Sequence, residues 1–181
     1  MAEFPDGLVQ PDRRSCGAAC LVAAQGLRDS DYRERVSEPE AFRVEGLAMH
    51  ARVTSPVDVA GHLQPPWPRA LGTPPWAMAN QLAGTTGVPH RPVPVRWRHG
   101  AVAYDELVGL SGPAALYVGN EWLPRHVVLV LEAGEARLRV YEPASGRVDI
   151  VGRDRFVDHE LGLGGWDVPW FSVVAGPAPR S

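Results

Sequence analysis

The segment over residues 16–26 constrains the fold more than any other part of the sequence. It reads CGAACLVAAQG, and its small and apolar residues cover every side of a helix rather than one face. A helix that is apolar all round is stable only when other elements surround it. Ser15 stands at the N-cap position, and Gly26 can end the helix. The sequence therefore predicts a central, buried helix.

The C-terminal half of the chain has the pattern of a sheet. A final strand is predicted over residues 166–176, and the prolines of residues 88–97 restrict that segment to an edge strand. Four further apolar segments separated by glycine-containing turns predict strands over residues 114–119, 126–133, 136–143 and 146–152. Helices followed by an antiparallel sheet make an α+β fold. The chain has 181 residues and no internal repeat or clear linker, so we expect one domain over residues 1–181.

The other helical segments are short. After a helix over residues 31–36 we expect a loop up to residue 46, and the proline-rich residues 64–76 are also expected to form a loop. Further short helices are predicted over residues 57–63, 76–82, 104–110 and 153–161.

Composition and charge exclude several classes of protein. The net charge of −3 without a basic block argues against nucleic acid as a partner. No apolar run approaches the roughly 20 residues that span a bilayer. The first ten residues lack the basic and apolar regions of a signal peptide, so we expect a protein that is cytoplasmic, or that is secreted or delivered as part of a larger chain.

Two cysteines, Cys16 and Cys20, lie four positions apart on one face of the predicted helix. A disulfide along one helical turn is sterically poor, so we expect two free thiols. Two cysteines also exclude a disulfide scaffold and a four-cysteine zinc site. No pair of histidines has convincing metal-ligand spacing, and no metal or organic cofactor is expected.

Cys16 begins the predicted helix, where a thiol can be reactive. The backbone N–H groups and the dipole at this end of a helix favour a thiolate and can donate to a developing oxyanion. Gly17 would let a substrate approach the backbone closely. Taken alone, Cys16 has a second interpretation, because free cysteines are among the most buried residue types. Cys20 is interpreted as core packing.

A thiolate nucleophile needs an imidazole partner, and His126 is the best candidate. It opens the apolar strand HVVLVL, at the rim of the predicted sheet. If the next hairpin turns at residues 134–135, Glu142 lies nearly opposite His126 and can orient the imidazole. Gln10 lies six positions before Cys16, and its amide can donate to the same oxyanion. Trp122, four positions before His126, is a candidate for the wall of a substrate cleft.

These residues resemble the papain-like cysteine peptidases of the double-glycine, bacteriocin-processing type. The matching segments are QPDRRSCGAAC, which starts at Gln10, and EPASG, which starts at Glu142, sixteen positions after His126. The resemblance implies a papain-like fold with Gln10 as oxyanion donor, Cys16 as nucleophile, His126 as general base and acid, and Glu142 as orienting residue. The sequence departs from the family where Ser15 and Glu142 replace aspartates. Residues 72–87 are similar to papain-fold toxin domains of bacterial competition systems.

Three functions are consistent with this set of residues. The first is a cysteine peptidase that cleaves a protein or peptide substrate, as an effector toxin with a cognate immunity protein or as a stand-alone processing enzyme. The second is a deamidase or acyl transferase that uses the same residues, because one triad serves all these reactions. The third is a catalytically inactive binding module with the same fold.

Overall fold

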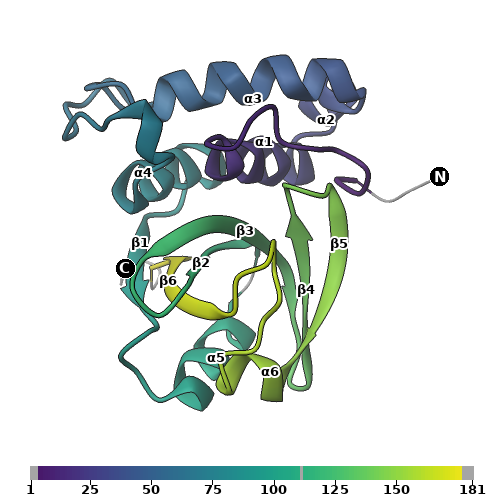
Figure 1. Cartoon of the computed structure of the whole chain (residues 1–181). Helices are drawn as coiled ribbons and strands as arrows, with labels where there is room; N and C mark the ends of the chain where they lie inside the picture. The colour runs from purple at the N-terminus through teal and green to yellow at the C-terminus, as the bar shows by residue number, and fades with distance from the viewer. Residues whose placement is uncertain (1–3, 111, 177–181) are drawn as a thin grey trace.

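A computed structural model describes residues 4–110 and 112–176 of the chain. Helices come first in the sequence and lie together on one side of a six-stranded antiparallel sheet, and two short helices lie on the other side (Figure 1). The helical elements are α1 (Cys16–Arg28), α2 (Ser30–Val36), α3 (Pro39–Val53), the 3-10 turn η1 (Arg69–Leu71), α4 (Pro75–Thr86), α5 (Gly100–Val108) and α6 (Arg153–Val157). Within the described ranges, no helix has the length and apolar character that crossing a bilayer requires.

The sheet has the strand order β1-β6-β2-β3-β4-β5, and every neighbouring pair is antiparallel. Its strands are β1 (His90–Pro94), β2 (Ala114–Gly119), β3 (Pro124–Ala133), β4 (Arg137–Glu142), β5 (Arg147–Gly152) and β6 (Val168–Ala175). Strand β1, which contains prolines, lies at one edge of the sheet. No strand pairs with its outer side, so an N–H group that proline lacks there breaks no hydrogen bond to a neighbouring strand. The predicted strands and the predicted edge position are confirmed.

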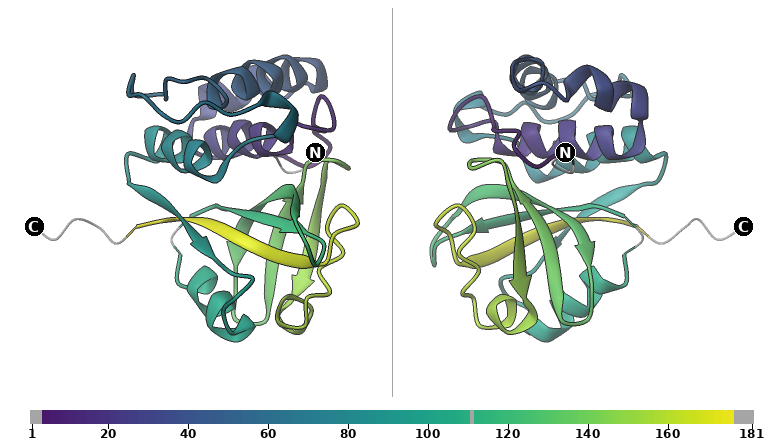
Figure 2. Two further views of the ribbon diagram at one scale, coloured as in Figure 1. Left: turned by 60° about the vertical axis from the view of Figure 1, so that its left-hand side comes forward. Right: turned by 90° about the vertical axis from the view of Figure 1, so that its right-hand side faces the viewer.

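Helix α1 is the centre of the helical layer, as predicted. It contacts α2, α3, α4 and β3, and ten of its thirteen residues are buried. Two views of the molecule show α1 between the outer helices and the sheet (Figure 2). Alternate residues of each central strand face two separate cores. In β2, Tyr117 packs on the α1 side, and Leu116 packs on the side of α5 and α6.

Helix α3 is the main element that differs from the sequence prediction, which has a loop over residues 37–46. Pro39 occupies the first turn, and Phe42, Gly46, Met49 and Val53 are buried at helical spacing along one face. Charged residues separate these positions in the sequence and obscure the apolar stripe. The stripe packs against α1, so this helix completes the enclosure of the central helix.

Smaller differences concern the ends of elements. Helix α4 continues past Gly84 and ends at Thr86, and the residue that caps it is Gly87, whose φ of 72° suits a glycine. Residues 57–63 form a turn closed by a Val57–Leu63 bridge rather than the predicted helix. Helix α5 starts at Gly100, before the predicted residue 104.

The β3–β4 hairpin has a different register from the predicted one. Leu129 pairs with Tyr141, so Glu142 lies diagonally from His126 rather than directly opposite. The difference arises because the connecting turn is longer than two residues, and a bulge follows Val130. The two side chains still share one face of the sheet, since side chains alternate with a period of two.

Candidate active site

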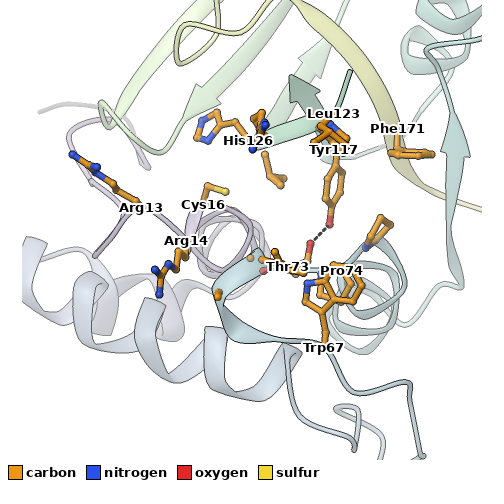
Figure 3. Close-up of a pocket in the computed structure, with 17 residues that line it drawn as sticks. Arg13, Arg14, Cys16, Trp67, Thr73, Pro74, Tyr117, Leu123, His126 and Phe171 are labelled. Carbon is orange, nitrogen blue, oxygen red and sulfur yellow. Dashed lines mark hydrogen bonds between the residues drawn. The ribbon is translucent and has the colours of Figure 1, made fainter. Parts of the chain in front are cut away.

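Cys16 and His126 line one cavity of about 570 Å³ between the helical layer and the sheet. Cys16 is the first residue of α1, and His126 is the third residue of β3. Figure 3 shows both side chains at the middle of the cavity. Cys16 is only 6% exposed, so this thiol lies at the bottom of the cavity rather than on the surface.

A tight turn over residues 12–15 delivers Cys16 to the start of α1. The Asp12 carboxylate accepts from the backbone N–H of Arg14 at 2.8 Å, and the Ser15 hydroxyl donates to the Asp12 carbonyl at 3.3 Å. Ser15 occupies the predicted N-cap position, but its side chain bonds this turn instead of capping the helix. The first N–H groups of a helix have no intrahelical partner, so the backbone beside Cys16 can donate to an anion.

His126 and Glu142 form a close pair behind the cavity. The distance from His126 Nε2 to Glu142 Oε1 is 2.6 Å, and both side chains are buried. Glu142 also accepts from the backbone N–H groups of Ala144 at 2.9 Å and Ser145 at 2.8 Å, in the turn after β4. The carboxylate is therefore held from two sides, and His126 Nδ1 is left for interaction with Cys16.

The pair is ionised at neutral pH. Burial raises the pKa of Glu142, but hydrogen bonds from His126, Ser145 and Ala144 outweigh it and bring that pKa down from 4.5 to about 2. Burial likewise lowers the pKa of His126, but hydrogen bonding with Cys16 and Glu142 and their charges raise it from 6.5 to about 9. The protonated imidazole of His126 therefore lies beside Cys16, with which it shares the cavity.

Gln10 lies next to this pair in space but does not line the cavity. Its backbone N–H donates to the Pro143 carbonyl at 2.8 Å, which ties the N-terminal segment to the turn after Glu142. Its side-chain Nε2 donates to the Asp12 carbonyl at 2.5 Å, and its Oε1 is buried without a hydrogen-bond partner. Because Gln10 does not line the cavity, its amide must move before it can donate to a substrate oxygen.

Neither of the two predicted substrate contacts, Gly17 and Trp122, lines the cavity. A Cβ on Gly17 would lie 2.7 Å from the Thr73 Cβ, so this glycine allows the wall segment around Thr73 to pack on α1. Trp122 is 82% exposed in the β2–β3 turn and does not line the cavity. Its neighbour Leu123 does line the cavity. The tryptophan points outward because the Asn120 side chain accepts from its backbone N–H and closes the turn.

Sequence reasoning missed most of the cavity wall. The proline-rich segment predicted only as a loop supplies Trp67, Leu71, Thr73 and Pro74, and the Tyr117 hydroxyl donates to the Thr73 carbonyl at 2.9 Å. Trp67 Nε1 and Thr73 Oγ1 are buried without a hydrogen-bond partner, a feature that is rare outside functional regions. The high proportion of proline and tryptophan in this segment is the sequence feature that could have predicted an ordered loop at the cavity wall.

The remaining candidates are structural. Cys20 is fully buried, its thiol faces the Val127 carbonyl at 3.5 Å, and burial raises its pKa well above the usual value. The core-packing interpretation of Cys20 is confirmed, and both cysteines are free. His50 is buried in α3. Across the described part of the chain, no group of three or more His, Cys, Asp or Glu side chains is arranged to hold a metal ion.

Comparisons with known proteins identify the fold. No family model and no curated protein matches the chain. Among solved structures, the Pseudomonas avirulence protein AvrPphB matches with a TM-score of 0.50 and 12% identity, over 88% of this chain and 89% of that one. The peptidase domain of Streptococcus mutans ComA matches with a TM-score of 0.47 and 15% identity, over 94% and 98%. Its complex with a small-molecule inhibitor matches with a TM-score of 0.48 and 16% identity, over 94% and 98%.

At sequence identities this low, a structural match shows a similar fold and does not show a shared function. The succession of helices and an antiparallel sheet, with the nucleophile candidate at the start of the central helix, agrees with that likeness. The expected α+β papain-like fold is thereby confirmed.

Proposed function

We propose that the chain is a cysteine peptidase that uses Cys16 as nucleophile and His126 with Glu142 as its acid–base pair. The observation that carries the proposal is the buried 2.6 Å His126–Glu142 pair beside Cys16, at a helix N-terminus and in a cavity. Burial of an ion pair costs free energy, because both charges lose their hydration. The pair is useful in a peptidase because it would keep a thiolate nucleophile charged.

In the first half of the reaction, the Cys16 thiolate attacks a peptide carbonyl. The new S–C bond places a negative charge on the carbonyl oxygen, which the backbone N–H at the helix start and, after rotation, the Gln10 amide stabilise. His126 then donates its proton to the departing amine, and the C–N bond breaks. A thioester on Cys16 remains.

In the second half, water hydrolyses the thioester. Neutral His126 accepts a proton from the water, whose oxygen attacks the carbonyl carbon, and the Cys16 thiolate leaves as the acid product departs. Throughout both halves, Glu142 bonds His126 Nε2, which keeps Nδ1 directed at the sulfur and stabilises the imidazolium.

The first experiment measures alkylation of Cys16 by iodoacetamide at pH 6, with mass spectrometry of the labelled peptide. We expect the wild-type protein to react at least about 10-fold faster than His126→Ala, since the imidazolium no longer stabilises the thiolate in the variant. Cys20→Ala is the matched control, because it removes the other thiol of the same helix and leaves Cys16 in place. Equal rates for the wild type and His126→Ala would contradict the proposal.

The reaction type is tested on cellular proteins incubated with the wild type or with Cys16→Ala. New peptide termini that appear only with the wild type support a peptidase. A mass increase of about one unit on glutamine, without cleavage, instead supports a deamidase. A protein that has no effect in either assay, and whose biological activity survives alkylation of Cys16, is a binding module.

We also propose that the protein acts as an effector against other cells and is neutralised by a cognate immunity protein in its producer. The similarity of residues 72–87 to papain-fold toxins supports this role. Expression of the wild type should arrest the growth of a bacterial host, and expression of Cys16→Ala should not. Equal growth with the two proteins would indicate a processing enzyme instead.

A further inference from the structure

The cavity has two chemically different ends. Arg13 and Arg14 lie at one end, and Trp67, Pro74 and Phe171 lie at the other, with the catalytic candidates between them (Figure 3). A substrate that extends across the cavity therefore meets positive charge on one side of its reacting bond and apolar surface on the other.

The charged end holds two exposed arginines, Arg13 and Arg14, from the turn before α1. A third exposed arginine, Arg125, also lines the cavity and precedes His126 on β3. Their side chains have no ion-pair partner within the described residues, and no carboxylate lines the cavity. The protein as a whole has a net charge of −3, so the positive charge at this position is local.

The nearby acidic groups are engaged elsewhere. The Asp12 carboxylate accepts from a backbone N–H of its own turn, and the Glu142 carboxylate is bonded to His126. Glu121, in the turn before β3, pairs with Arg96 at 2.5 Å. The arginines at the cavity are therefore not neutralised from within the protein and can pair with carboxylates of a substrate.

The other end is apolar and partly exposed. Trp67 packs edge-on against Trp76, with ring centroids 5.1 Å apart. Phe171 packs against Trp97 at 6.1 Å, and Trp97 is 70% exposed. Leu123, which lies above Tyr117 in Figure 3, also lines the cavity and is 50% exposed. Burial of a large apolar side chain on this surface would be favourable.

We propose that the cavity selects an extended peptide segment with acidic side chains on one side of the reacting bond and a large apolar side chain on the other. The inference deepens the proposed peptidase function and rests on it for the position of the reacting bond. Arg13 and Arg14 determine the acidic preference, and the Trp67–Phe171 surface determines the apolar one.

The experiment measures binding, so that it does not depend on turnover. Immobilised Cys16→Ala protein is incubated with a mixture of peptides from a digested proteome, and the retained peptides are sequenced. We expect enrichment of segments in which Asp or Glu lies within a few residues of Phe, Leu or Trp. The enrichment should be about 5-fold or more over Gln-containing segments, and it should weaken at 1 M salt, where charges are screened beyond about 3 Å.

Two further variants, each combined with Cys16→Ala, separate local from overall charge. Arg13→Gln with Arg14→Gln and the single change Arg137→Glu each lower the net charge by two. Arg137 is exposed at the end of β4 opposite to Glu142 and away from the cavity. We expect the double variant to lose most of the acidic enrichment, whereas Arg137→Glu retains it.

The outcomes distinguish this inference from the proposed function. Three results would overturn the inference: retained peptides without an acidic preference, an equal loss in both variants, or no retained peptides at all. Alkylation of Cys16 tests the proposed catalytic residues independently of these results. Acidic enrichment together with an unreactive Cys16 would support the binding preference and contradict the peptidase.

Discussion

Replacement of Glu142 by glutamine tests the buried pair most directly, because it removes the charge and retains the shape. In the folded protein the pKa of Glu142 is about 2, compared with 4.5 for an ordinary glutamate. A difference of this size corresponds to about 3 kcal/mol of stabilisation of the ionised carboxylate, at about 1.4 kcal/mol for each pKa unit. The raised pKa of His126 reflects partly the same interaction, so the two shifts are counted once.

The sign of the pH dependence follows from the two groups. Because the pKa of Glu142 is lowered, its contribution to stability is complete above about pH 4.5 and is lost as the pH falls through about 2. Because the pKa of His126 is raised, its contribution is complete below about pH 6.5 and is lost as the pH rises through about 9. The pair therefore stabilises the fold most between about pH 4.5 and 6.5.

We expect Glu142→Gln to lower the unfolding free energy by about 2 kcal/mol at pH 6, because the amide retains part of the hydrogen bonding to the turn. For a protein of this size that corresponds to roughly 4–8 °C in the melting temperature, measured by circular dichroism. The difference between variant and wild type should shrink toward pH 2 and toward pH 9. A difference that is independent of pH would refute the reasoning.

Three further substitutions have defined outcomes. Gly164→Ala should reduce both stability and peptide cleavage, since its φ is +58° and a Cβ would lie 2.9 Å from His126 Cδ2; unchanged cleavage would show that this loop does not position the imidazole. Trp122→Ala should leave kcat/KM within about twofold, because the ring is exposed outside the cavity, and a larger loss would restore its predicted substrate contact. Tyr117→Phe should cost about 1 kcal/mol in urea unfolding and raise KM, because the Thr73 segment loses its hydrogen bond to the sheet; an unchanged KM would mean that the wall holds without this bond.

Several features of this fold follow from local sequence patterns. The apolar residues of α1 predict a helix that must be enclosed, and alternating apolar segments predict the strands that follow. The spacing of His126 and Glu142 in the sequence also predicts that the two side chains lie on one face of a hairpin, and in the structure they are in contact. Such patterns are readable because helix and strand periodicity repeat within a few residues.

Other features depended on contacts between distant parts of the chain. The apolar face of α3 is recognisable only once α1 is there to cover it, and the β3–β4 register depends on the length of a turn. In that register, the Glu142 side chain spans the diagonal from β4 to His126, and an aspartate there would be one methylene shorter.

The sequence by itself determined the central helix and the strands, and which side chains are candidates for chemistry. Only the tertiary structure decided that the Thr73 segment forms the wall of the cavity, that Trp122 faces solvent, and that the Gln10 amide bonds its own turn. The physical reason is the distance along the chain over which each effect acts. Backbone preference and periodicity act over a few residues, whereas the orientation of a side chain depends on neighbours that are tens of residues away in the chain.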